Sequence, residues 1–266
     1  MESDDFEALK RLIEKTLRIK CQNYKEAYIR RRLLSRMRSA GCESYDAYLR
    51  YLRDNPGEFE LLRNALTINV TEFYRDPEVF EIVHRELFPT ILKNRGRVRL
   101  WCAGCSSGEE AYTLAILLAE TLGITNIRNA VIYATDIDEM VLARAKDGVY
   151  EEKALSKIPE ALVRKHLTRR EDGLYEVRPH LRSMIRFTRH DLMMGQPIAR
   201  FLDMVSCRNV TIYFTEAQKN DLARLFHGAL SPGGFYVMGK TEYLSREVDH
   251  LFKTHNSSQK VFVKND

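Results

Sequence analysis

Apolar residues recur at every third or fourth position over residues 1–90, and this spacing predicts helices throughout that part of the chain. Five runs carry the pattern: Phe6–Leu17, Tyr28–Met37, Tyr45–Leu52, Glu58–Leu66 and Pro77–Leu87. Ser44 is a suitable N-cap for the third run, and Pro77 suits the first turn of the fifth. We therefore expect an all-helical N-terminal domain over residues 1–75, followed by a linker helix over 76–94.

After Gly96 short apolar runs alternate with helical stretches. The runs that predict strands are Val98–Ala103, Ala130–Ala134, Met184–Phe187, Asp203–Cys207, Phe235–Met238 and Lys260–Val263. Strands that alternate with helices predict a doubly wound α/β fold, with a parallel sheet covered on both faces. Residues 149–182 fit this alternation poorly, because they are charged and contain a hairpin-like segment, Gly173–Val177. We interpret them as a small β insertion in a catalytic domain over residues 95–266.

Composition excludes a membrane span and a disulfide framework. Of the 266 residues 44% are apolar and 30% are charged, and no apolar run approaches the ~18 residues that a span needs. The first ten residues are acidic and amphipathic, unlike a signal peptide, so we expect a cytoplasmic protein. The five cysteines are sparse, and no second pair completes a metal site with Cys102 and Cys105. We expect no metal, and we expect this C-x-x-C to be chemically idle.

Charge is concentrated between Lys20 and Ala40, where seven basic residues face one acid, Glu26. A basic helical face suits an acidic partner, which could be nucleic acid, an anionic membrane or an acidic protein surface. A solvated helix face without a partner is the alternative.

The turn Gly104–Gly108 follows the first expected strand and precedes a helix. Such a turn exposes helix N-terminal amides to a ligand, but it serves NAD, FAD and S-adenosylmethionine alike. It lacks the G-x-G-x-x-G fingerprint and the lysine of a phosphate loop. Glu109 and Glu110 would repel a pyrophosphate and suit a cationic ligand such as S-adenosylmethionine. Asp136, at the end of the second strand, can accept both hydroxyls of a ribose, since Asp138 can cap the next helix.

Three blocks resemble the CheR family of chemotaxis receptor methyltransferases: Asn69–Arg75, Ala103–Tyr112 and Ser206–Phe214. The Ala134–Asp138 run also matches, and order and spacing agree over nearly the whole chain. The resemblance implies a class I methyltransferase with a Rossmann-like sheet, and a transfer of methyl from S-adenosylmethionine to receptor glutamates. The products would be glutamate γ-methyl esters and S-adenosylhomocysteine.

The resemblance also assigns site residues. It implies that the cofactor contacts are Asn69, Thr71, Arg75, Glu110, Asp136, Asp191, Leu192, Arg208 and Asn209, and that Arg75 and Tyr213 lie near the transferred methyl group. At Asp191 the family more often has asparagine, and Lys240-Thr241-Glu242 departs from the usual His-Ser-Glu. A glutamate acceptor is ionised at neutral pH, so the chemistry needs orientation rather than a general base.

The basic helix gains a candidate role from the resemblance. We hypothesise that Arg30, Arg31, Arg36 and Arg38 contact the acidic cytoplasmic helices of the receptor, so that the N-terminal domain recognises the substrate. We expect a monomer that neither binds nucleic acid nor inserts into the membrane. A nucleic-acid methyltransferase would usually carry an N-P-P-Y/F run where this chain has Arg208–Val210. A silent signalling scaffold would not need Arg75, Glu110, Asp136 and Tyr213 intact.

Overall fold

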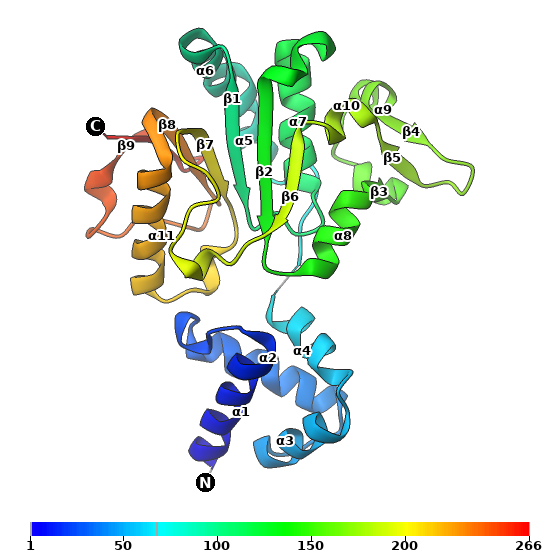
Figure 1. The fold of residues 1–266 in the computed structure, drawn as a ribbon, viewed down its shortest axis with the longest axis vertical. Helices are drawn as coiled ribbons and strands as arrows, with labels where there is room; N and C mark the ends of the chain where they lie inside the picture. Colours follow the sequence, from blue (N-terminus) through cyan, green and yellow to red (C-terminus); the bar gives the residue numbers. More distant parts are fainter. Residues whose placement is uncertain (1, 68, 266) are drawn as a thin grey trace. The chain divides into compact units, whose positions relative to one another are not determined.

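The computed structural model describes residues 2–67 and 69–265, which form two compact units (Figure 1). One unit runs to Asn69 and also takes in Tyr213–Gln218, and the other comprises Val70–Ile212 and the chain from Lys219 onward. The units divide at 69/70, whereas the sequence pattern placed the end of the helical domain at 75 and set 76–94 apart as a linker. Among the described residues no helix is both long and apolar enough to cross a bilayer.

Four helices build the first unit: α1 (Glu2–Leu17), α2 (Glu26–Ser39), α3 (Tyr45–Asp54) and α4 (Glu58–Leu66). A short 3-10 turn, η1 (Cys21–Asn23), joins α1 to α2. The helical spacing seen in the sequence becomes the core, because Phe6, Leu9 and Leu33 are fully buried in one cluster. Ser44 accepts a hydrogen bond from the Ala47 amide at 3.1 Å, which confirms the predicted N-cap of α3.

The segment Tyr213–Gln218 belongs to the helical unit through backbone pairing. The Lys25 amide donates to the Tyr213 carbonyl at 3.0 Å, and Tyr24 forms an isolated antiparallel bridge with Phe214. The Tyr213 ring lies 4.8 Å from that of Tyr28, measured between centroids. Local sequence patterns do not predict this pairing, because it joins residues far apart along the chain.

A seven-stranded sheet of order β6-β2-β1-β7-β8-β10-β9 forms the centre of the second unit. Its strands are β1 (Val98–Ala103), β2 (Ala130–Asp136), β6 (Ile185–Arg189), β7 (Leu202–Cys207), β8 (Leu230–Met238), β9 (Phe252–Asn256) and β10 (Val261–Lys264). The first five strands in this order are parallel, and β10 runs antiparallel to both neighbours. The expectation of a wholly parallel sheet was therefore wrong at one end. The sequence pattern missed β9 entirely.

Helices cover both faces of this sheet, which confirms the doubly wound class. On one face α5 (Pro77–Ile82), the π turn η2 (Val83–Leu87) and α6 (Phe88–Arg95) follow one another without a break. They share a core with α7 (Glu109–Leu122) and α8 (Glu139–Asp147). On the other face α11 (Glu216–Ala229) places Phe226 5.2 Å from the ring of Trp101. The 3-10 turns of this part of the chain are η3 (Ile124–Asn129), η4 (Glu152–Leu155), η5 (Leu192–Met194), η6 (Thr211–Tyr213), whose last residue belongs to the helical unit, and η7 (Asp249–Leu251).

The predicted β insertion is a three-stranded antiparallel sheet of order β3-β5-β4. Its elements are β3 (Val149–Tyr150), α9 (Glu160–His166), β4 (Leu167–Arg169), β5 (Tyr175–Val177) and α10 (Pro179–Arg182). The β4–β5 pair forms the hairpin that the sequence indicated. A hydrogen-bonded chain ties the insertion to α7: the His166 Nε2 contacts the Glu120 carboxylate at 2.8 Å, and its Nδ1 contacts His180 at 2.9 Å.

Candidate functional site

The turn after β1 is fixed against the end of β2. The Gly104 and Cys105 amides both donate to the Thr135 carbonyl, at 2.8 and 2.9 Å. Gly104 has a φ of +79°, and a Cβ there would lie 2.5 Å from a methyl group of Val210. Only glycine fits such a position without displacing the loop that follows β7. The next residue but one, Ser106, also has a positive φ, of +47°.

Asp136 lies at the carboxyl end of β2, beside this turn. One of its carboxylate oxygens accepts from the Ser106 amide at 2.8 Å, and the other accepts from the Asp138 amide at 3.0 Å. Burial raises the pKa of the Asp136 carboxyl above its usual value. Asp138 accepts from the Met140 amide at 2.9 Å and so caps α8. The prediction that Asp138 caps the helix after β2 is confirmed. Asp136 does not cap this helix, and its carboxylate lies beside the turn after β1.

Glu110 and Arg208 form a buried ion pair. Arg208, with a side chain only 1% exposed, donates to one Glu110 oxygen at 2.9 Å, and the Ser206 hydroxyl donates to the other at 2.6 Å. Arg208 also donates to the Asp76 carboxylate at 2.8 Å and to the Arg75 carbonyl at 2.7 Å. The sequence treated Glu110 and Arg208 as separate ligand contacts. In the structure they neutralise each other and join α7 to the segment before α5.

That segment, Val70–Asp76, is wedged against α7. The Tyr74 amide donates to the Thr113 hydroxyl at 3.1 Å, and both Tyr74 and Asp76 have left-handed backbone conformations. The Arg75 guanidinium donates to the Val70 carbonyl at 3.0 Å, and Thr71 is half-buried. Non-glycine residues with positive φ cluster at functional sites more often than elsewhere. Asn69 precedes this segment in the helical unit, where its amide donates to Thr67 at 3.4 Å.

Glu242 organises the loop after β7, and sequence reasoning gave it no role. Its carboxylate, in a residue 3% exposed, accepts from the amides of Gly239 (2.7 Å), Asn209 (2.8 Å) and Thr211 (2.7 Å), and from the Thr211 hydroxyl (2.7 Å). The only sequence signal was the glutamate that ends Lys240-Thr241-Glu242. Four hydrogen bonds to one buried carboxylate fix the backbone on both sides of Val210.

The polar atoms near this loop and the β1 turn that are buried without a hydrogen-bond partner among the described residues include the side-chain amide oxygen of Asn209 and the Ser106 hydroxyl. Asn209 also has a strained φ of +60°. Buried polar atoms normally have partners, so such atoms mark a place where a ligand can complete the hydrogen bonding. Both lie beyond the carboxyl ends of parallel strands, where open α/β sheets bind their ligands.

Asp191 and Leu192 follow β6 at the same edge of the sheet. The Asp191 carboxylate accepts from the Met193 amide at 2.9 Å and so caps η5, while Leu192 is buried. A cap needs only an acceptor, which aspartate and asparagine both provide. The departure from the usual family residue therefore leaves this turn intact.

The arginines of α2 differ in how far they are free. Arg36 forms a bidentate ion pair with Glu58, at 2.9 and 2.8 Å, and the Glu58 side chain is only 4% exposed. Arg30 pairs with Glu26 at 2.7 Å and lies 3.8 Å above the ring of Phe6. Arg31 and Arg38 are exposed and form no ion pair with any residue described. Two arginines of the basic face, Arg30 and Arg36, therefore form ion pairs within the helical unit. Arg31 and Arg38 remain available to a partner.

The cysteines of the second unit are buried thiols. Burial raises the pKa of Cys102, Cys105 and Cys207 well above the usual value, so all three are protonated at neutral pH. Within residues 2–67 and 69–265 no group of three metal-ligating side chains comes together.

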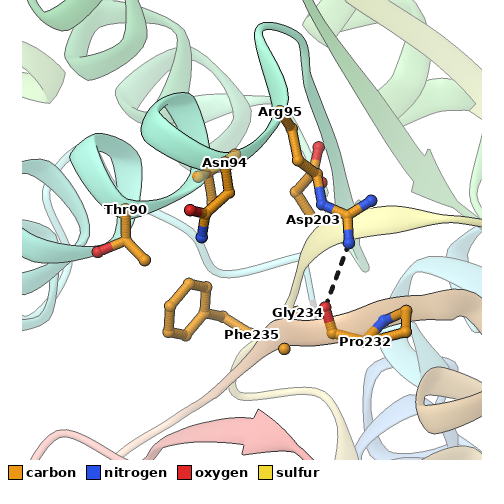
Figure 2. Close-up of a pocket in the computed structure, with 9 residues that line it drawn as sticks. Thr90, Asn94, Arg95, Asp203, Pro232, Gly234 and Phe235 are labelled. Atoms are coloured by element: carbon orange, nitrogen blue, oxygen red, sulfur yellow. Dashed lines mark hydrogen bonds and ion pairs between the residues drawn. The ribbon is translucent and has the colours of Figure 1, made fainter.

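A cavity of about 230 Å³ opens at the opposite edge of the sheet, between α6 and the start of β8 (Figure 2). In it Arg95 donates to the Pro232 carbonyl at 3.2 Å and pairs with Asp203 at 3.3 Å, and the ring of Phe235 lies across from Thr90 and Asn94. None of the predicted site residues lines this cavity, which lies at the amino ends of the strands.

Comparison with known proteins gives the family. The model described as "CheR methyltransferase, SAM binding domain" matches residues 69–261, and "CheR methyltransferase, all-alpha domain" matches residues 4–67. A chemotaxis protein methyltransferase of Listeria innocua is 31% identical over 95% of both chains. Chemotaxis protein methyltransferase 1 of Pseudomonas aeruginosa is 33% identical over 92% of both. A chemotaxis protein methyltransferase of Borreliella burgdorferi is 30% identical over 90% of this chain and 88% of its own.

The sheet order and these matches define an S-adenosylmethionine-dependent methyltransferase of class I. The chain belongs to the CheR family, as its sequence motifs indicated. The site fits the cofactor, because Asp136 and Asn209 offer oxygen acceptors to hydroxyl and ammonium donors. The turn at Gly104 admits a ligand close to the backbone without offering a lysine to a phosphate.

Proposed function

We propose that this enzyme methylates glutamate side chains on the cytoplasmic helices of chemoreceptors and forms glutamate γ-methyl esters. We propose further that it works in the cytoplasm as a monomer. The observation that carries the proposal is the end-to-end match with chemotaxis protein methyltransferases, in which the helical domain is included. S-adenosylmethionine supplies a methyl group already activated by a sulfonium, and S-adenosylhomocysteine is the product.

The residues around the turn after β1 would hold the cofactor. Asp136 would accept the ribose hydroxyls, and its fixed orientation by the Ser106 and Asp138 amides supports this role. Asp191 and Leu192 would flank the adenine. The remaining contacts proposed are Asn69, Thr71, Arg75, Glu110, Arg208 and Asn209. Because Glu110 and Arg208 pair with each other, we assign them the further task of holding the Arg75 backbone in position.

Catalysis in this proposal is a matter of alignment. The acceptor glutamate is ionised at neutral pH and needs no proton removed. Arg75 and Tyr213 would orient the carboxylate and the methyl group, and orientation alone can supply several kcal/mol. Tyr213→Phe keeps a ring against Tyr28 and removes only the hydroxyl. We expect it to lower kcat with little effect on cofactor affinity. An unchanged kcat would remove Tyr213 from the mechanism.

We assign receptor recognition to the basic face of α2. Of the four arginines first considered, Arg30 and Arg36 are held in ion pairs within the helical unit. Arg31 and Arg38 are the exposed arginines of this set that can reach a partner without breaking an ion pair with a described residue. The double variant Arg31→Glu, Arg38→Glu should raise the KM for receptor and leave cofactor binding unchanged. Arg53→Glu is the control for each single variant, Arg31→Glu or Arg38→Glu, because Arg53 is exposed and has no ion pair with any described residue. Arg36→Glu should instead destabilise the helical unit, because it would leave Glu58 buried beside a second carboxylate.

The experiment that tests the proposal is transfer of tritiated methyl from labelled cofactor to receptor-containing membranes. We expect label that mild alkali releases, as esters require. Alkali-stable label would indicate methylation of nitrogen, and cofactor binding without any transfer would indicate a scaffold. Asp136→Asn provides an internal control, since it should weaken cofactor binding and transfer together.

A further inference from the structure

Exposed arginines line the amino ends of three neighbouring strands. Arg97 directly precedes β1, Arg128 lies two residues before β2, and Arg200 lies two residues before β7. We call these three residues the arginine edge. The strands are parallel neighbours in the order β2-β1-β7, and their registers place the three arginines at nearly the same level along the sheet, at its top in Figure 1. At about 4.8 Å per strand the row spans roughly 10 Å.

Among the described residues no acid pairs with this row. Segments 94–103, 124–135 and 192–202, which contain the row, hold five arginines and no aspartate or glutamate. The nearest acid along the chain, Asp203, is buried and bound to the Arg95 guanidinium and the Arg99 amide. None of the three side chains of the arginine edge forms an ion pair or hydrogen bond with another described residue. The edge is therefore a surface of one sign that invites an anionic partner.

Two large apolar side chains stand at the same edge. Phe201 directly precedes β7 and is 69% exposed, and Ile124 begins the turn that leads into β2 and is 43% exposed. Phe201 also has a φ of +57°, a backbone conformation that is strained for a bulky residue. A strained residue that holds a phenyl ring in water is more consistent with a binding role than with packing. The partner should thus offer an apolar phase as well as negative charge.

A bilayer surface combines these two properties. Lipid phosphates attract arginine, while phenylalanine and isoleucine enter the boundary between headgroups and acyl chains. A single-stranded nucleic acid fits less well, because the Tyr133 ring that could stack on a base is flanked by the guanidiniums of Arg99 and Arg186, at 6.0 and 5.8 Å. We propose that the arginine edge, with Phe201 and Ile124, docks reversibly on an anionic phospholipid bilayer.

This docking would leave the cofactor site accessible. Asp136 and the turn after β1 lie at the carboxyl ends of the same strands, which are about six residues or ~20 Å away along the sheet. The enzyme could therefore bind the bilayer and a substrate at the same time. The arginine edge shares no residue with the proposed cofactor or receptor contacts. The proposal of bilayer docking and the proposal of receptor methylation can therefore be refuted independently of each other.

Co-sedimentation of the full-length protein with lipid vesicles tests the proposal. We expect binding to phosphatidylcholine vesicles that contain phosphatidylglycerol, little binding to pure phosphatidylcholine, and loss of binding at ~1 M salt, where the screening length is ~3 Å. Each arginine near an anionic surface contributes about fivefold in affinity. The double variant Arg97→Glu, Arg128→Glu should therefore bind at least about 25-fold more weakly. Phe201→Ser should weaken binding about tenfold at low salt, where the wild-type protein binds.

Arg169→Glu, Arg246→Glu is the matched control, because it makes the same charge change at exposed arginines away from the arginine edge. Arg97→Gln, Arg128→Gln removes charge without reversing it and covers the case in which the reversed variant does not fold. Equal loss in the control, or no preference for phosphatidylglycerol, would overturn the proposal. So would edge variants that lose binding to single-stranded polyuridylate but keep vesicle binding, because the edge would then be a nucleic-acid surface.

Discussion

Glu242→Gln is the substitution that tests most sharply how the site is held together. The side chains are nearly identical in shape, so the change removes charge and one acceptor without creating a cavity. The glutamine amide can turn its oxygen toward the Asn209 and Gly239 amides or toward Thr211, but not toward both. In either orientation its NH₂ group faces at least one backbone N–H donor at the distance of a former hydrogen bond.

The magnitude follows from the hydrogen bonds lost. A hydrogen bond to a charged group contributes about 1.5–3 kcal/mol, and the variant loses two of the four while weakening the others. We therefore expect the free energy of unfolding to fall by about 3–5 kcal/mol, a large share of the ~5–15 kcal/mol that a domain possesses. Because Asn209 is a proposed cofactor contact, affinity for S-adenosylhomocysteine should fall as well.

Urea unfolding and calorimetric titration with S-adenosylhomocysteine measure the two effects. The midpoint should shift to lower urea with an unchanged slope. Glu247→Gln is the control, since the Glu247 side chain is 71% exposed and its partners among the described residues are Arg224 and Asn220. It should change stability by less than about 1 kcal/mol. A loss below about 1 kcal/mol in Glu242→Gln would refute the assignment of Glu242 as the residue that fixes this loop.

Two further predictions rest on local geometry. Gly104→Ala should abolish detectable cofactor binding, because the new Cβ would collide with Val210. The control is Gly123→Ala, where φ is also positive (+74°) but the space around the Cβ is open. It should lower the free energy of unfolding in urea by only about 1 kcal/mol. Burial lowers the pKa of His166, so the unfolded chain binds a proton that the native chain does not, and stability should fall as pH drops below about 6.5. In urea unfolding measured across pH, His166→Gln should flatten this dependence of stability on pH. The control His250→Gln, at an exposed position, should leave it unchanged. Equal slopes of stability against pH for the wild type and His166→Gln would contradict the reasoning.

Local patterns predicted most helices, most strands and the caps of α3 and α8, since each depends on neighbouring residues. The Asp138 cap could be predicted because it uses amides two and three residues ahead. The Glu242 carboxylate could not, because the groups that it binds include amides about thirty residues earlier in the chain. The same reason hid the Glu110–Arg208 pair and the union of Tyr213–Gln218 with the helical unit. Charge counting overestimated the free basic face of α2, since it could not reveal that Arg36 pairs with Glu58.

Mass spectrometry of a chemoreceptor, after incubation with this enzyme and S-adenosylmethionine, tests the central claim most directly. The account predicts the added mass of one methyl group on glutamate residues of the cytoplasmic helices, removed by mild alkali and absent with Asp136→Asn. Methyl groups on lysine or arginine, or an unmodified receptor in the presence of an enzyme that binds the cofactor, would contradict it.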